Sequence, residues 1–387
     1  MHASMNRIYR LIWSEILGAW VAVAESARGK GKRNGHTLLA PAFAAFGLGA
    51  SMGAFAAPPA PTELPAGAKV VGGQVVVTQN GAAMNIQQST ARGAIDWQTF
   101  NLGAKASVNF AQPSASAVTL NRVLDAQPSQ IFGRITSNGQ VFLSNPNGVY
   151  FSPSASVDVG GLVATTHNMS SADFMAGMNT FSRGGATGSV INEGSLHATL
   201  GGYIALLAPE VRNYGLITAR AGTVALASGE QIKLQFGDSN TLAGVIVTPS
   251  AIAALVENRQ AVLVPGGTII MSAQAANRLM GGVINNTGAL EANGLTNDGG
   301  RIMLAASDQI SAGGTISANA AAGSAGRGGT VTLIADLANS ASRTDVSGSF
   351  SARGGDSGGD GGFIETSASH LSIRDATRVD ARAAHGK

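Results

Sequence analysis

The chain has 387 residues, of which 52 are glycine, 12% are charged and none is cysteine. Without cysteine no disulfide framework is possible, so packing and backbone hydrogen bonds would have to hold an exported fold together. The formal net charge of +3 comes from residues 1–56, which hold six basic and two acidic side chains. The other 19 basic and 20 acidic residues give no support for nucleic-acid binding.

The first 56 residues have the layout of a secretory leader. Basic residues precede an apolar run at residues 37–55, and the small-residue sequence Ala-Phe-Ala closes it. A transmembrane helix is the alternative, which Pro41 within the run and the prolines just after it disfavour. The layout predicts a cleaved signal peptide over residues 1–56, with cleavage after Ala56 or Ala57.

The part of the leader before the apolar run is unusually long. Residues 5–33 resemble the extended signal-peptide region of very large Gram-negative exoproteins and autotransporters, which favours Met5 as the start. A cytoplasmic amphipathic helix is the alternative interpretation, but it leaves the apolar run unexplained. The resemblance is carried by Met5-Asn6-Arg7-Ile8-Tyr9-Arg10, Trp13, Trp20-Val21-Ala22-Val23, Glu25 and Ala27-Arg28-Gly29-Lys30.

Residues 70–166 contain the most specific sequence motifs of the chain. They closely resemble the haemagglutination-activity, or two-partner secretion, domain of the filamentous haemagglutinin family. The matching elements include Asn85-Ile86-Gln87-Gln88, Ile95-Asp96-Trp97, Val108-Asn109-Phe110, Leu120-Asn121-Arg122-Val123, Asn145-Pro146-Asn147-Gly148 and Gly160-Gly161-Leu162-Val163-Ala164. One departure is Asp125-Ala126, where relatives usually have glycine, and it is expected to change a local turn.

The resemblance implies a secretion mechanism. The exoprotein would cross the inner membrane by the general secretory route, and a dedicated outer-membrane β-barrel transporter with periplasmic domains would recognise its N-terminal domain. The chain would then pass through unfolded and wind into a right-handed β-helix outside. The candidate recognition residues are Asn85, Asn121, Arg122, Asn145, Pro146, Asn147 and Gly148. The last four also read as a tight turn with proline at its second position.

A nine-residue template recurs further along the chain. It reads apolar, x, Asn, x, Gly, x, apolar, x, Ala at residues 190–198, 211–219 and 284–292, and most copies precede glycine and an alternating strand. Each unit is too small to bury its own apolar face, so stacking is required. Asparagine and glycine mark the corners, and equivalent asparagines are expected to stack into a ladder.

These repeats predict an all-β fold, a parallel β-helix (solenoid) with short extra-helical hairpins or a helix. The family resemblance implies in addition that this β-helix is right-handed and has an N-terminal cap. The alternatives are a β-sandwich, which does not need a recurring corner template, and a β-propeller, whose blades would need a longer and more regular period. The predicted domains are the signal peptide at 1–56, the capped secretion domain at 57–240 and further coils at 241–387. In the alternating segment 231–236, Ile232, Leu234 and Phe236 are expected to face inward.

Two further expectations concern the later part of the chain. A short helix is predicted at residues 249–256, where three apolar residues share one helical face. The chain ends without a capping segment, so a truncated or partial protein is expected.

Residues 355–359 spell Gly-Asp-Ser-Gly-Gly, a serine-protease signature, but a glycine-rich repeat turn without a suitable histidine is the better interpretation. One imperfect glycine–aspartate run is too little for a calcium repeat, and the six scattered histidines indicate no metal site. We therefore expect no enzyme activity and no cofactor.

The predicted function is that of a secreted, monomeric surface exoprotein that acts as an adhesin on host cell-surface ligands and binds no nucleic acid. The alternatives are the N-terminal part of a contact-dependent growth inhibition toxin and a haem-carrier-binding exoprotein. The sequence does not separate these roles, because effector regions of this class lie downstream.

Overall fold

The computed structural model describes residues 9–14, 19–24, 57–237, 241–276 and 281–386. The chain divides into two compact units, Met1–Gly53 and Ala54–Lys387. In the first unit the antiparallel strands β1 (Tyr9–Ser14) and β2 (Ala19–Ala24) pair, so this part of the leader is not the helix considered above. The apolar run of the predicted signal peptide and the predicted cleavage position after Ala56 lie outside the described residues. The other predicted position, after Ala57, lies within them.

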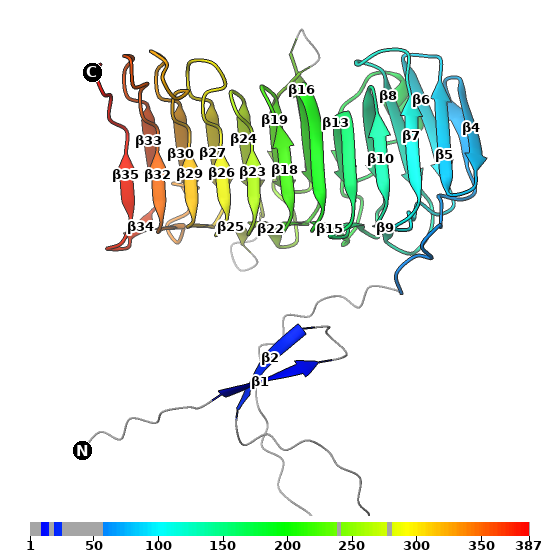
Figure 1. Cartoon of the computed structure of the whole chain (residues 1–387), viewed down its shortest axis with the longest axis horizontal. Helices are drawn as coiled ribbons and strands as arrows, with labels where there is room; N and C mark the ends of the chain where they lie inside the picture. The colour runs from blue at the N-terminus through cyan, green and yellow to red at the C-terminus, as the bar shows by residue number, and fades with distance from the viewer. Residues whose placement is uncertain (1–8, 15–18, 25–56, 238–240, 277–280, 387) are drawn as a thin grey trace, which may run out of the picture. The chain divides into compact units, whose positions relative to one another are not determined.

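The second unit is a parallel β-helix of stacked coils (Figure 1). Its strands lie on three sides of the coils. We call the three resulting sides faces A, B and C, in the order in which the chain crosses A, then B, then C. Face A contains β5 (Ala83–Gln88), β7 (Ser107–Ala111), β10 (Arg134–Ser137), the first halves of β13 (Ser156–Thr165) and β16 (Ser195–Leu207), β18 (Leu216–Ala219), β23 (Ala261–Leu263), β26 (Ala289–Glu291), β29 (Thr315–Ser317), β32 (Ser349–Ser351) and β35 (Arg378–Asp380).

Face B is formed by the strands that follow those of face A. It contains β6 (Arg92–Trp97), β8 (Val118–Val123), β11 (Gln140–Ser144), the second halves of β13 and β16, β19 (Thr223–Ser228), β24 (Thr268–Ala273), β27 (Arg301–Ala306), β30 (Thr330–Ala335) and β33 (Phe363–Ser367).

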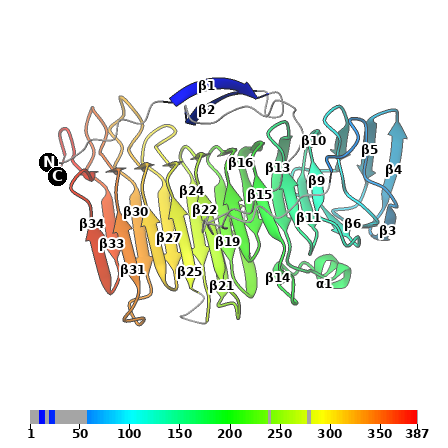
Figure 2. The same ribbon diagram turned by 90° about the horizontal axis from the view of Figure 1, so that it is seen from below.

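Face C is a separate parallel sheet of short strands, visible as a row in Figure 2. It contains β9 (Ser129–Ile131), β12 (Val149–Phe151), β15 (Ser189–Asn192), β17 (Glu210–Asn213), β22 (Ala254–Asn258), β25 (Gly282–Asn286), β28 (Gln309–Ala312), β31 (Arg343–Val346) and β34 (His370–Ile373). The three faces together confirm the predicted β-helix.

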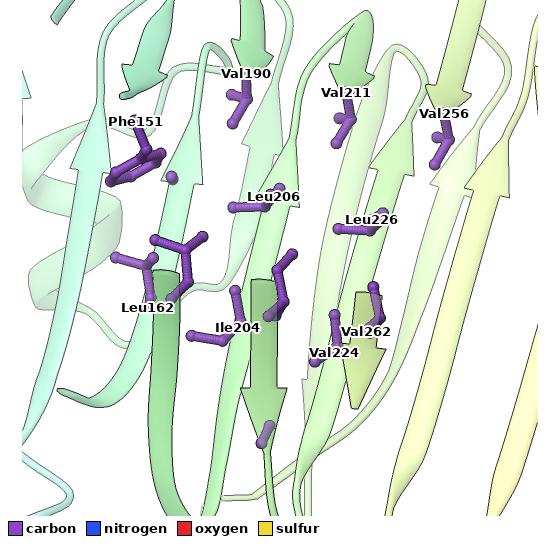
Figure 3. Packing of buried hydrophobic residues seen from close by; sticks show 14 of the residues in the cluster. Phe151, Leu162, Val190, Ile204, Leu206, Val211, Val224, Leu226, Val256 and Val262 are labelled. Carbon is purple, nitrogen blue, oxygen red and sulfur yellow. The ribbon is translucent and has the colours of Figure 1, made fainter. Parts of the chain in front are cut away.

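The interior is a continuous column of aliphatic side chains. On face C, Val190, Val211 and Val256 stand in register on successive coils, and all three are fully buried (Figure 3). Leu206 and Leu226 form the equivalent column on face B. Burying a side chain of this size contributes roughly 1.5–3 kcal/mol, so stacking provides the stability that one coil lacks.

Asparagines form the predicted ladder at the corner between faces C and A. The side-chain amide of each donates to the side-chain oxygen of the next at 2.8 Å, and the last donates to the Gly313 carbonyl oxygen at 2.8 Å. All members are buried, so each coil supplies the hydrogen bonds that water would otherwise provide. The ladder consists of Asn192, Asn213, Asn258 and Asn286.

Glycines line the corner between faces A and B, where successive turns stack backbone on backbone. A Cβ added to any of these glycines would lie closer than 3.0 Å to the carbonyl oxygen of the glycine one coil earlier. No side chain fits there, which explains the glycine that precedes each strand of face B in the repeats. The column runs through Gly160, Gly202, Gly222, Gly267, Gly300, Gly329 and Gly362.

The N-terminal end of the helix is capped, as predicted. Strands β3 (Lys69–Gly72) and β4 (Val75–Asn80) run antiparallel to β6 and β5 and cover the edge of the first coil. Leu64, just before them, joins the core. An open edge of unpaired backbone groups is thereby moved away from the parallel ladders.

A second core lies on the outer side of face B, under an extra-helical layer that we call the excursion sheet. It comprises β14 (Thr180–Ser182), β20 (Gln231–Phe236) and β21 (Leu242–Thr248), all antiparallel, beside the short helix α1 (Ser171–Met175). The side of β20 predicted to face inward is the covered one, with Ile232 and Leu234 buried and Phe236 partly buried. All three pack on this second core and not in the helix interior.

The helix predicted at residues 249–256 is wrong. Residues 251–252 form a bend, and Ala254–Asn258 is strand β22, which pairs in parallel with β17 and β25. The buried residues Ala254, Val256 and Asn258 follow the two-residue period of a strand. Pairing with two neighbouring coils therefore outweighed the local helical spacing.

Candidate functional site

Six of the seven predicted recognition residues come together at the corner between faces B and C. Residues 121–127 comprise the last three residues of β8 and the segment that follows it, and the turn at residues 145–148 follows the end of β11, one coil later. Because parallel strands end at the same edge, the two segments lie side by side. We call this region the corner site.

The turn is set by its own residues. The Gly148 amide donates to the Asn145 carbonyl at 3.0 Å, and the Asn147 amide donates to Oδ1 of Asn145 at 3.0 Å. Pro146 occupies the second position, where its fixed φ suits the turn. Gly148 has φ of +131°, a conformation that few side chains tolerate. The predicted tight turn is confirmed.

Both asparagines of the turn hold the preceding coil. Nδ2 of Asn147 donates to the Asp125 carbonyl at 2.7 Å, and Nδ2 of Asn145 donates to the Gln127 carbonyl at 2.9 Å and to Oγ of Ser129 at 3.0 Å. Asn145 is fully buried, whereas Asn147 is exposed. The segment with the unusual Asp125 is therefore fixed by the turn of the following coil.

Asn121 lies inside the β-helix. Its Oδ1 accepts a hydrogen bond from the Trp97 indole Nε1 at 3.0 Å, and its Nδ2 donates to the Phe142 carbonyl at 3.2 Å. Asn121 and Trp97 are both fully buried. Burying an indole N–H without an acceptor is unfavourable, so Asn121 satisfies a polar group of the core. Its role in this geometry is structural.

Arg122 points outward from the same strand and pairs with Asp96 on the preceding coil. Its Nε and one terminal nitrogen donate to the two carboxylate oxygens, each at 2.8 Å. The Arg122 side chain is 29% exposed and that of Asp96 is 14% exposed. A bidentate pair of this kind fixes the orientation of the guanidinium group at the surface.

Asn85 does not belong to the corner site. It lies on face A, where its Oδ1 accepts a hydrogen bond from Nδ2 of Asn109 at 2.9 Å, and Oδ1 of Asn109 accepts one from Thr136 at 2.9 Å. This is a ladder on the outer surface of three successive coils. The structure separates Asn85 from the other six predicted residues.

Two adjoining hollows shape the surface of the corner site. One, of about 230 Å³, is lined by Arg122, Asn147 and neighbouring residues. The other, of about 420 Å³, is lined by Lys69, Asp96 and neighbours. Both include Leu124 and Asp125, and Leu124 is 67% exposed between them. The sequence contained a signal for Leu124, since it directly follows the buried Val123 and cannot face the same way.

The other motifs carry no comparable geometry. Ser357 of the protease-like string is exposed in a turn, and its hydroxyl donates to the Gly323 carbonyl at 2.9 Å on the preceding coil. Within the described ranges no group of three or more metal-ligating side chains gathers. The same ranges hold no helix long and apolar enough to cross a membrane.

Comparisons with known proteins agree with this architecture. The family profile described as TPS secretion domain matches residues 62–318, and the one described as Extended Signal Peptide of Type V secretion system matches residues 5–54. The HMW1 secretion domain from Haemophilus influenzae, a solved structure, superposes with a TM-score of 0.72 at 24% identity, over 82% of this chain and 84% of that one. That likeness concerns the fold.

Two curated relatives are similar in sequence, both named heme/hemopexin-binding protein. The one from Haemophilus influenzae strain Rd is 34% identical over 253 residues, 64% of this chain and 28% of the relative. The other, also from Haemophilus influenzae, is 30% identical over 263 residues, 62% of this chain and 28% of the relative. The chain thus spans less than a third of the length of these relatives.

The matched signal peptide and secretion domain indicate Sec-dependent export followed by secretion through the outer membrane. This confirms the resemblance drawn from residues 5–33 and 70–166. The chain belongs to the two-partner secretion family: it carries an extended signal peptide and a TPS secretion domain that a cognate outer-membrane transporter recognises.

Proposed function

We propose that the corner site is the part of the secretion domain that the transporter contacts, with these coils formed locally before the rest of the chain passes through unfolded. The observation that carries the proposal is the bond from Asn147 to the Asp125 carbonyl, which joins two predicted recognition segments of different coils into one surface. The geometry of the turn does not require the exposed leucine, Leu124, that lies between the two hollows. Exposed apolar side chains beside a polar rim are typical of protein interfaces.

The predicted residues divide by role within this proposal. Asn121, Asn145 and Gly148 are buried and shape the surface from beneath. Leu124 and Asn147 are accessible, and they are the groups that a periplasmic domain would touch. An extended segment of the transporter would place an apolar side chain against Leu124 and polar groups towards Asn147.

Leu124→Ser and Asn147→Ala test the proposal, with Asn109→Ala as the matched control. Asn109 belongs to the outer ladder on face A, away from the corner site. We expect Leu124→Ser to weaken binding of the purified domain to the transporter's periplasmic domains by ~10-fold, the size of one interface contact. Secretion in cells with the cognate transporter would fall in parallel.

Folding is checked separately by chemical denaturation of the same proteins. The denaturation midpoint of Leu124→Ser should equal that of the original, because an exposed side chain contributes little to stability. Asn109→Ala should bind and be secreted normally. If Leu124→Ser and Asn147→Ala both bind the transporter as tightly as the original, the corner site is not the contact surface.

We propose further that the exported protein acts as a non-enzymatic, monomeric adhesin that binds host cell-surface ligands. The β-helix supports this role because it presents long regular faces. The chain's match to the heme/hemopexin-binding relatives covers 28% of their length and overlaps the secretion domain, so it bears on export more than on the ligand.

Binding of the purified protein to host cells and to haem-loaded hemopexin separates the two roles, and light scattering gives its oligomeric state. Cell binding without hemopexin binding supports adhesion. Hemopexin binding alone would replace it by haem-carrier capture, and killing of neighbouring bacteria that lack immunity would replace it by contact-dependent growth inhibition.

A further inference from the structure

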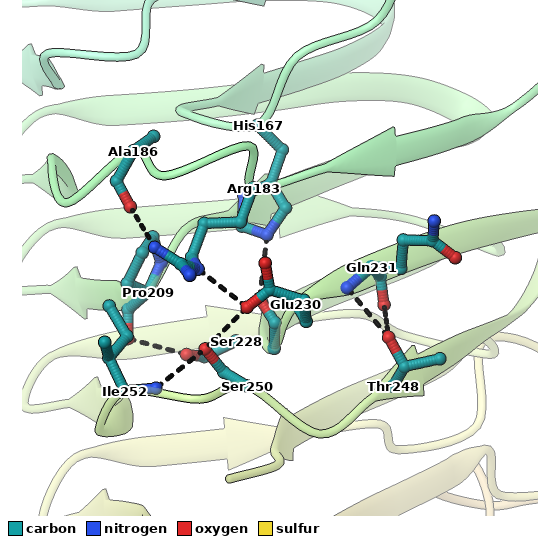
Figure 4. A network of polar contacts seen from close by, with 11 residues as sticks. His167, Arg183, Ala186, Pro209, Ser228, Glu230, Gln231, Thr248, Ser250 and Ile252 are labelled. Atoms are coloured by element: carbon teal, nitrogen blue, oxygen red, sulfur yellow. Dashed lines mark hydrogen bonds and ion pairs between the residues drawn. The ribbon is translucent and has the colours of Figure 1, made fainter. Parts of the chain in front are cut away.

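A buried histidine lies where the excursion sheet joins the β-helix (Figure 4). His167 lies two residues after the end of β13 and is fully buried. Its Nε2 is 2.9 Å from the carbonyl oxygen of Gly229, which stands in the turn between β19 and β20. This bond therefore joins the end of a β-helix strand to the start of the excursion sheet, 62 residues later.

An ion pair between Arg183 and Glu230 lies at the same junction. Nε of Arg183, just after β14, donates to Oε2 of Glu230 at 2.8 Å, and Oγ of Ser250, just after β21, donates to the same oxygen at 3.2 Å. The Arg183 amide also donates to the Glu230 carbonyl at 2.8 Å. All three strands of the excursion sheet are thus tied together beside His167.

The protonation state of His167 follows from these partners. A carbonyl oxygen only accepts, so Nε2 carries the hydrogen and Nδ1 is the bare nitrogen. Nδ1 is buried and has no hydrogen-bond partner among the described residues. A second proton there would create a buried cation whose new N–H has no acceptor, which is strongly unfavourable.

The charged groups that face the ring are Arg183 and Glu230. Burial lowers the pKa of His167, the nearby Arg183 lowers it too, and the Gly229 carbonyl and Glu230 raise it, with a net decrease. The neutral ring is therefore the form that fits the closed junction.

We propose that His167 is a pH-sensitive latch, which holds the excursion sheet on the β-helix while its ring is neutral and releases the sheet when the ring is protonated. The sheet covers an apolar surface on face B, with Phe142 and Val163 beneath Ile232 and Leu234. Acidic conditions would uncover this surface without unwinding the coils, whose ladders do not involve His167.

The direction of the pH effect follows from linkage. The pKa of His167 is lower in the closed state than in the open state, so the closed state is favoured fully above the ordinary value near 6.5 and less as the pH falls below it. At pH 5.5 an open-state histidine is protonated ~10-fold over neutral, which shifts the opening equilibrium by up to ~10-fold.

Hydrogen exchange of the purified exported protein at pH 7.5 and 5.5 tests the latch, with labelling times scaled for the intrinsic rate. We expect the protection of β14, β20 and β21 to fall by up to ~10-fold at pH 5.5, while that of β27 and β30 is unchanged. In His167→Gln the amide can still donate to Gly229 but does not titrate, so protection should not depend on pH.

Glu230→Gln distinguishes the latch from the ion pair. Arg183 holds the pKa of Glu230 below its usual range, so this carboxylate does not titrate between pH 7.5 and 5.5. The variant should keep the pH response of the original, although it opens more readily at both values. A response that disappears in Glu230→Gln and persists in His167→Gln would overturn the proposal.

The imidazole signals of the original protein give a second test. Histidine labelled at the ring carbon gives four signals outside the leader, from His167, His197, His370 and His385. The signal of His167, assigned by its absence in His167→Gln, should remain in the neutral form at pH 5.5. If this signal titrates near the ordinary value of ~6.5, the latch does not exist.

Discussion

Asn213 donates from its side-chain amide to the side-chain oxygen of Asn258 across 2.8 Å, although 45 residues separate them. The neighbouring hydrogen bond of the same ladder, from Asn192 to Asn213, joins residues only 21 positions apart and is also 2.8 Å long. The excursion hairpin of β20 and β21 accounts for the difference. An insertion of this size therefore leaves the register of the coils unchanged, because the buried amides accept only one stacking position.

Asn213→Ala should destabilise the β-helix by about 1–3 kcal/mol, since it leaves the Asn192 amide and the Asn258 oxygen without their partner. The measurement is the denaturation midpoint in urea. Asn109→Ala is the matched control, because Asn109 occupies an outer ladder where water replaces its bonds. Equal losses in both variants would show that burial of the ladder contributes nothing.

Gly300→Ala should destabilise the fold by about 1–3 kcal/mol through overpacking. The new Cβ would come closer than 3.0 Å to the carbonyl oxygen of Gly267 and to that of Ala292, and backbone cannot move aside as a flexible side chain can. Gly237→Ala, whose Cβ would meet its nearest neighbour at 3.7 Å, should be neutral. Thermal unfolding compares the two, and an unaltered midpoint for Gly300→Ala would contradict the proposed close contact.

Asn121→Leu should cost about 1–3 kcal/mol in the free energy of unfolding, because the Trp97 indole N–H then has no acceptor. A double-mutant cycle with Trp97→Phe measures this interaction, and the loss should be smaller when the indole is already absent. Transporter binding by the folded Asn121→Leu protein should be retained. A selective loss of binding would instead assign Asn121 to the contact surface.

Arg183→Gln should loosen the excursion sheet at neutral pH. Arg183 lowers the pKa of Glu230, so the ion pair stabilises the fold above the ordinary glutamate pKa and loses this effect as the pH falls through the lowered value. Cleavage by chymotrypsin at Phe236 should be faster in the variant at pH 7.5, and the difference from the original should shrink in acid. Identical cleavage rates at pH 7.5 would rule out a stabilising role for the pair.

The sequence revealed most of the fold because a β-helix repeats local chemistry. The template at residues 190–198 and 211–219 marks corners with asparagine and glycine, and these features predicted the coils and the asparagine ladder. The same local reading failed at residues 249–256, where apolar spacing suggested a helix. Strand β22 formed there because two neighbouring coils offered a full set of backbone hydrogen bonds.

The corner site was only partly predictable. The family-like motifs indicated Asn121, Arg122 and residues 145–148, but the structure shows that some of these residues are buried and structural while others are accessible at the surface. It also placed Asn85 on another face and added Leu124 to the site. Exposure depends on which coil covers which, and no spacing along the chain contains that information.

By itself the sequence determined that this protein is exported, that it winds into coils, and which residues turn its corners, because these properties depend on residue types within a few positions of one another. The tertiary structure alone decided that Asn147 holds the Asp125 carbonyl and that His167 meets Gly229 beneath the excursion sheet. Those contacts join residues 22 and 62 positions apart, and only the stacking of successive coils brings them within hydrogen-bonding distance.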